Sequence, residues 1–209
     1  MTPYTACLVD VYETALSVDL PQWGALLAAT AGVEPRAFAA AVSQRADPVA
    51  DGRLTVRLAI EETLTDLGVP TDDGVVDRVL AADQKYVREQ AVLHEDTVPF
   101  LESLRAKGVR TAFVSNCADN TRPLLGWLGL DSLVDELVLS CEVRAAKPDP
   151  RIFEVALARL GVAAESAVFV DDQPAFCDAA TALGIRAVLI DRVGGAGEVS
   201  TLADLADYF

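Results

Sequence analysis

Three carboxylates, a hydroxyl and an ammonium stand at breaks in the apolar pattern of this 209-residue sequence. In chain order they are Asp10, Ser115, Lys147 and the adjacent pair Asp171 and Asp172. Carboxylate oxygens are ligands that Mg²⁺ favours, and Mg²⁺ bridges carboxylates to phosphate. A carboxylate that is not only a ligand can act as a nucleophile. One aspartate after a strand is more often a turn or a helix cap, so the prediction of a divalent-cation and phosphate site needs a fold that gathers all five.

The elements that would position these side chains are short apolar runs of the kind that form buried strands. The runs cover residues 6–9, 109–114, 133–139, 167–170 and 186–190. Segments with helical periodicity separate them, and this alternation is typical of a doubly wound α/β fold with a parallel sheet. Because ligands bind at the carboxyl ends of the strands in such folds, we expect the five side chains to meet there.

A long helical segment separates the first two predicted strands. Glycine and proline breaks divide it into four helices, at residues 23–32, 35–45, 55–68 and 73–93. An insert after the first strand would hang over the edge where ligands bind. We therefore predict an α/β core of residues 1–14 and 95–209 with a small all-helical cap domain of residues 15–94.

The charge balance narrows the class of partner. Acidic residues outnumber basic ones by 32 to 17, for a net charge of −15. Such a surface repels phosphate backbones and anionic lipid, so we expect no nucleic-acid or membrane binding. Residues 1–4 lack the features of a signal peptide, and the four cysteines have no zinc-like spacing. Reduced thiols and a cytoplasmic location follow as expectations.

Four motifs, in order, resemble those of the haloacid dehalogenase-like hydrolase superfamily. They are Leu-Val-Asp-Val-Tyr-Glu-Thr at 8–14, Phe-Val-Ser-Asn at 113–116, Lys-Pro-Asp-Pro-Arg-Ile-Phe at 147–153 and Phe-Val-Asp-Asp at 169–172. The likeness runs from Cys7 to about Asp191. It implies a Rossmann-like core with a helical cap inserted after the first strand.

The resemblance also implies roles for the site residues. Asp10 would be the nucleophile that forms a covalent aspartyl intermediate, and Lys147 would neutralise charge on nucleophile and substrate. Ser115 would hold the transferring group, with Asn116 supporting its loop. The implied catalytic residues are Asp10, Tyr12 and Lys147, and the implied substrate-binding residues are Ser115, Asn116 and Lys147.

Mg²⁺ is the cofactor that the resemblance implies. Asp172 would ligate it directly and Asp171 through water. The full set of implied metal-binding residues is Asp10, Tyr12, Asp171 and Asp172.

Tyr12 departs from the superfamily's phosphatase pattern, which has a second aspartate two residues after the nucleophile. That aspartate protonates the leaving oxygen, whereas a tyrosine with an ordinary pKa near 10 is a poor donor at neutral pH. Glu13 and His94 are candidates for a substitute acid. The 2-haloacid dehalogenase branch has tyrosine at this place, because a departing halide needs no proton, but it lacks the Asp-Asp pair.

The leading expectation is a Mg²⁺-dependent phosphatase that acts on a small phosphorylated metabolite and favours good leaving groups. A 2-haloacid dehalogenase-like hydrolase is one alternative. A catalytically impaired binding or regulatory protein is the other. Tyr12 favours the two alternatives, and Asp171 with Asp172 favours the phosphatase.

Overall fold

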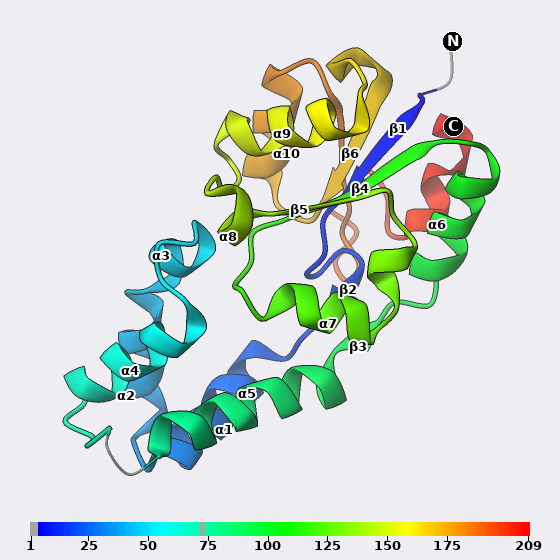
Figure 1. The fold of residues 1–209 in the computed structure, drawn as a ribbon. Helices are drawn as coiled ribbons and strands as arrows, with labels where there is room; N and C mark the ends of the chain where they lie inside the picture. The colour runs from blue at the N-terminus through cyan, green and yellow to red at the C-terminus, as the bar shows by residue number, and fades with distance from the viewer. Residues whose placement is uncertain (1–3, 72–73) are drawn as a thin grey trace.

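The computed structural model describes residues 4–71 and 74–209, and within these ranges five parallel strands form the main sheet (Figure 1). The strands are β1 (Ala6–Val9), β4 (Arg110–Ser115), β5 (Glu136–Leu139), β6 (Ala167–Asp171) and β7 (Arg186–Leu189). Their order is β5-β4-β1-β6-β7, so β1 is central and the chain winds outward to both sides. This is the predicted doubly wound α/β fold, with β5 starting three residues later than its apolar run.

Successive side chains of each strand pack on opposite faces of the sheet. In β1, Cys7 and Val9 join one hydrophobic core while Ala6 and Leu8 join the other. The first core is covered by α6 (Thr97–Ala106) and α7 (Thr121–Trp127), and the second by α9 (Pro150–Leu160) and α10 (Pro174–Ala182). Burial on both faces explains why the strands are continuous apolar runs rather than alternating ones.

The start of α9 shows how the sequence sets an element next to the site. The Asp149 side chain accepts a hydrogen bond from the backbone N–H of Arg151 at 2.9 Å, and Pro150 occupies the first turn. Both are favoured at a helix N-terminus, as the sequence predicts. This start holds Lys147, two residues before the cap, beside the sheet edge.

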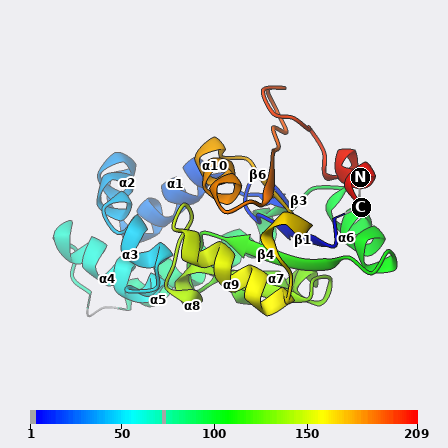
Figure 2. The ribbon, with the colours of Figure 1, turned by 90° about the horizontal axis from the view of Figure 1, so that it is seen from above.

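The helices between β1 and α6 form a separate body at one end of the molecule, which we call the helical insert (Figures 1 and 2). They are α1 (Leu20–Ala31), α2 (Pro35–Ser43), α3 (Ala46–Ala50), α4 (Val56–Asp66) and α5 (Val75–Gln90). The insert has its own hydrophobic core, which includes Leu27, Phe38, Ile60, Leu64 and Val79. The predicted start of the last helix, at 73, lies outside the described residues, as do residues 1–3.

The sequence pattern does not predict two parts of the insert region, helix α3 and a short two-stranded ribbon. Helix α3 has five residues, too few to show a helical period. Strands β2 (Leu16–Ser17) and β3 (Val92–Leu93) pair antiparallel where the chain enters and leaves the insert. The domain division at 14/15 and 94/95 falls beside this ribbon and stays a prediction.

Within residues 4–71 and 74–209, no single helix is both long enough and apolar enough to span a membrane. Helices α1 and α2 satisfy the length and hydropathy test only as a pair bent by 109°. Both helices contribute side chains to the core of the insert.

Candidate active site

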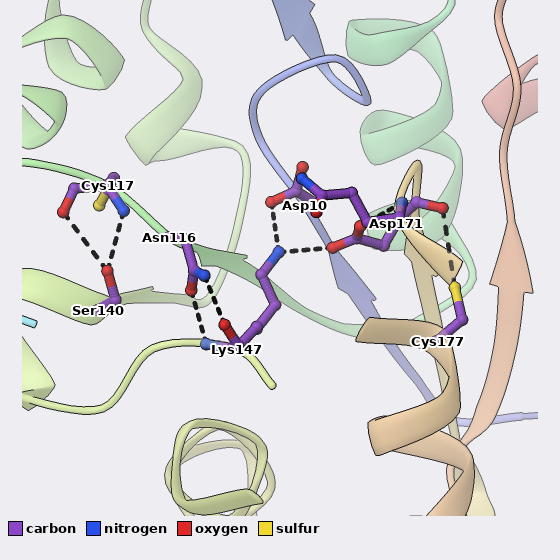
Figure 3. A network of polar contacts seen from close by, with 8 residues as sticks. Asp10, Asn116, Cys117, Ser140, Lys147, Asp171 and Cys177 are labelled. Carbon is purple, nitrogen blue, oxygen red and sulfur yellow. Dashed lines mark hydrogen bonds and ion pairs between the residues drawn. The ribbon is translucent and has the colours of Figure 1, made fainter. Parts of the chain in front are cut away.

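Lys147 joins two carboxylates at the carboxyl edge of the sheet (Figure 3). Its Nζ donates hydrogen bonds to Asp10 Oδ1 at 2.6 Å and to Asp171 Oδ2 at 2.5 Å. The Lys147 side chain is 1% exposed, and those of Asp10 and Asp171 are 8% and 0% exposed. Nζ also lies 5.4 Å and 5.1 Å from the ring centroids of Phe169 and Phe176. The ammonium is thus fixed by charge and by aromatic faces.

Asn116 holds the backbone of Lys147 at two points. Its Oδ1 accepts a hydrogen bond from the Lys147 N–H, and its Nδ2 donates one to the Lys147 carbonyl, both at 2.7 Å (Figure 3). The amide therefore connects the end of β4 to the lysine loop. Asn116 acts on the site by positioning Lys147.

An acidic cluster surrounds the ammonium. Asp10, Asp171 and Asp172 each offer a carboxylate oxygen within 4.8 Å of the others. Burial raises the pKa of Asp10 to about 7, an effect that Lys147 opposes and Asp171 reinforces. Burial and the charge of Asp171 raise the pKa of Asp172 to about 6. Three carboxylates against one ammonium leave excess negative charge among hard oxygen donors, a set that fits a divalent cation such as Mg²⁺.

Lys147 stays charged in these surroundings. Burial alone would lower its pKa, but the carboxylates of Asp10 and Asp171 outweigh burial and raise it. The site therefore keeps a positive charge beside its would-be nucleophile.

Ser115, the last residue of β4, has no exposed surface, and its hydroxyl has no hydrogen-bond partner among the described residues. Buried polar atoms in folded proteins nearly always have partners, so an unpaired one signals a ligand or a functional demand. Ser115 directly precedes Asn116 at the carboxyl end of β4, so its hydroxyl is a candidate donor to a bound phosphate.

Tyr12 follows Asp10 by two residues, but its hydroxyl points at Thr121. The phenol oxygen is 2.9 Å from Thr121 Oγ1. Burial raises the pKa of Tyr12 far above its usual range, so the phenol is a weak acid here. Its assignment as a catalytic and metal-binding residue stays a prediction.

A cavity of about 410 Å³ opens from the acidic cluster into the helical insert. Asp10, Tyr12 and Asp172 line it, and so does Glu13, whose Oε1 accepts a hydrogen bond from the N–H of Val18 at 3.3 Å. His94 is absent from the described lining. Of the two candidates for a substitute acid, Glu13 alone borders this space.

Sequence reasoning missed Asp83, a 2%-exposed carboxylate of α5 on the cavity wall. It accepts hydrogen bonds from Trp23 Nε1 at 2.8 Å and from Asn120 Nδ2 at 2.9 Å, and so joins the insert to the core. Burial raises its pKa. Its position between Val79 and Tyr86 on the apolar face of α5 is the signal that reveals it, since an acid at core spacing needs partners.

Comparison with known proteins places these features in one family. Residues 4–184 match the family model of a haloacid dehalogenase-like hydrolase. The chain is 38% identical over 98 residues to the GMP/IMP nucleotidase YrfG of Escherichia coli (strain K12), covering 46% of this chain and 44% of that protein. It is 33% identical over 110 residues to (S)-2-haloacid dehalogenase 1 of Pseudomonas sp. (strain CBS-3), covering 51% and 48%.

A solved structure of a HAD-family enzyme from Bacteroides thetaiotaomicron, in complex with magnesium and inorganic phosphate, has the same fold. Its TM-score is 0.74 at 17% identity, over 92% of this chain and 97% of that one. The matches to the two curated relatives span about half of each relative's length. The family model, by contrast, covers strands β1, β4, β5 and β6 of the main sheet and all four motifs, and the chain belongs to the haloacid dehalogenase-like hydrolases.

Proposed function

We propose that this hydrolase is a Mg²⁺-dependent phosphatase that acts on a small phosphorylated metabolite. The observation that carries the proposal is the cluster of Asp10, Asp171 and Asp172 around the ammonium of Lys147. Phosphoryl transfer depends mainly on positioning and on charge stabilisation, and this cluster supplies the groups for both. A cytoplasmic location, and the lack of nucleic-acid and membrane partners, stay predictions from the composition.

Asp10, Asp171 and Asp172 are the residues that would hold the metal ion. A Mg²⁺ ion held by these carboxylates would supply positive charge that offsets the negative charge of the phosphate. We infer in addition that the helical insert serves as the cap of this site.

The reaction follows from the side chains. The Asp10 carboxylate attacks phosphorus, the bond between phosphorus and the leaving oxygen breaks, and an aspartyl phosphate forms on Asp10. Water then attacks that phosphorus, which releases phosphate and restores the carboxylate. Lys147 and the Ser115 hydroxyl bind the developing negative charge, while Asn116 keeps Lys147 in place.

Asp10→Asn tests the proposal, because an amide is a far weaker nucleophile than a carboxylate. We expect the release of phosphate from 4-nitrophenyl phosphate to fall by at least about 10³-fold. The exposed Asp207→Asn change is the control and should leave the rate unchanged. Activity of the Asp10 variant within tenfold of the unmodified protein would remove Asp10 from its role.

The proton supply gives a second prediction. Because the Tyr12 phenol is a weak acid, it should protonate a leaving alkoxide poorly. After differences in substrate binding are allowed for, alkyl phosphates should be hydrolysed about 10²–10⁴-fold more slowly than aryl phosphates. Tyr12→Asp should speed alkyl esters and leave aryl esters nearly unchanged. Equal rates for both ester classes in the unmodified protein would show that another acid, with Glu13 the candidate on the cavity wall, supplies the proton.

A dehalogenase is the second candidate, favoured by Tyr12, because a departing halide needs no proton. The carboxylate of its 2-haloacid substrate would need a cation, and Lys147 is the one cation among the described residues that line the cavity. Release of halide from 2-chloropropionate in the presence of a chelator, with no release of phosphate from any ester, would replace the phosphatase by this function. Failure of both reactions would favour a binding or regulatory protein.

A further inference from the structure

The cavity beside Asp10 has a mostly apolar wall. It extends from the acidic cluster between the helices of the insert and reaches their hydrophobic core. Its volume of about 410 Å³ is within the range of small-molecule sites. The apolar lining comprises Val18, Leu20, Trp23, Leu27, Phe38, Val42, Val49, Val56, Ala59, Ile60, Val87, Ala118 and Phe176.

The charges of this wall repel anions. Among the described residues that line the cavity, the only cation is Lys147, and both Asp10 and Asp171 already bind it. Glu13 and Asp83 add carboxylates. A second phosphate or a carboxylate on the substrate would lose its hydration here without gaining a counter-ion.

A neighbouring cavity carries arginines, but Asp10 is not among the described residues that line it. Arg53, Arg144 and Arg151 line it, together with Asn116 and Lys147. Arg53 pairs with Asp51 and Arg151 with Asp149, each at 2.7 Å. Of these two cavities, the apolar one is bordered by Asp10 and Asp172, and the arginine-lined one is not. A phosphate placed for attack by Asp10 therefore has its leaving group on the apolar side.

We infer that the substrates are phosphate esters or acyl phosphates whose leaving group is uncharged and predominantly apolar, such as an aryl group. This inference rests on the proposed phosphatase function and narrows its substrate class. Burial of the apolar group against the insert provides the binding, and the acidic wall rejects esters that carry a second anion.

A matched pair of esters tests the charge preference. Methyl 4-(phosphonooxy)benzoate and 4-(phosphonooxy)benzoate have nearly the same shape and differ by one negative charge. We expect kcat/KM for the methyl ester to exceed that for the carboxylate by at least about 10²-fold. Binding of benzylphosphonate and phosphonoacetate, neither of which is hydrolysed, should show the same order in calorimetry.

Val49→Lys places a cation in the cavity on α3, a helix with no buried residue. The variant should lower kcat/KM for the methyl ester and raise it for the carboxylate, so that the ratio falls by tenfold or more. Leu58→Lys, at a 45%-exposed position of the insert that does not line the cavity, is the control and should leave the ratio unchanged.

Acetyl phosphate, whose leaving group is too small to need the cavity, separates the two proposals. If acetyl phosphate is hydrolysed in an Asp10-dependent reaction but the paired esters react equally, or the carboxylate reacts faster, the apolar substrate class is wrong and the phosphatase stands. If acetyl phosphate and both esters are inert, the phosphatase fails and the inference fails with it. Equal binding of the two phosphonates would also overturn the inference.

Discussion

Ser115 and Ser140 are two buried serines beside the site with opposite hydrogen-bonding states. The Ser115 hydroxyl has no partner among the described residues. The Ser140 hydroxyl accepts a hydrogen bond from the Cys117 N–H at 2.9 Å and donates one to the Cys117 carbonyl at 3.4 Å (Figure 3). A buried hydroxyl without a partner is destabilising, whereas a satisfied one is costly to remove.

We therefore expect Ser115→Ala to raise the free energy of unfolding by about 1 kcal/mol and to lower kcat/KM by about 10²-fold, since it removes a donor to the transferring phosphate. Ser140→Ala should instead lower the free energy of unfolding by about 1–3 kcal/mol. Urea denaturation and phosphate release measure the two effects. A Ser115 variant that loses stability while keeping its activity would contradict the assignment.

For single residues, the sequence predicts which side chains belong to the site better than it predicts the hydrogen bonds between them. Asp10, Lys147 and Asp171 follow recognisable strand ends and a helix start, so their meeting at one edge is predictable. The two hydrogen bonds from Asn116 to the Lys147 backbone are not, because they join residues whose distance apart is set by the packing of β4 and α9. The link from Asp83 to Asn120 was missed for the same reason.

Among the elements, the insert approaches the core closely at Gly52. A Cβ atom there would lie 1.9 Å from the carbonyl oxygen of Cys141, and the residue has a φ of +71°. Gly68 has the same φ, but a Cβ atom there would meet nothing within 4 Å. Gly68 thus offers a control with equal backbone strain and no close approach.

Gly68→Ala should lower the free energy of unfolding by about 1–2 kcal/mol and leave catalysis unchanged. Gly52→Ala should lower the free energy of unfolding by at least the same amount. It should also push α3 away from α8 (Ser140–Val143), which should change kcat and KM together by about tenfold. Denaturation curves and steady-state kinetics on both variants check this. Identical kinetics in the two variants would show that this contact does not matter to turnover.

The length and burial of an element decide whether the sequence pattern predicts it. The main strands are predictable because burial on both faces makes them continuous apolar runs. Strands β2 and β3 have two residues each and α3 has five, so none is long enough for its pattern to repeat. Their existence depends on the packing of the insert against the core.

For the molecule as a whole, the excess of negative charge affects stability. The net charge is −15, and the acidic cluster concentrates three carboxylates at one point. In a chelator, Asp172→Asn removes part of this repulsion and should raise the unfolding temperature by a few degrees. In millimolar Mg²⁺ the unmodified protein should gain stability by mass action, and the variant should gain much less. Calorimetric scans with and without Mg²⁺ measure both shifts, and an unmodified protein that ignores Mg²⁺ would contradict the proposed metal site.

The central place of β1 in the sheet also determines the order in which the chain can fold. The partners of β1 begin at Arg110 and Ala167, so β1 emerges from the ribosome long before either neighbour exists. The insert follows at once, and the described residues of its core all lie between Trp23 and Ala82. Local contacts form quickly and distant pairings slowly. The insert is therefore the part of the chain suited to fold co-translationally, while β1 stays an unpaired edge until β4 and β6 close over it.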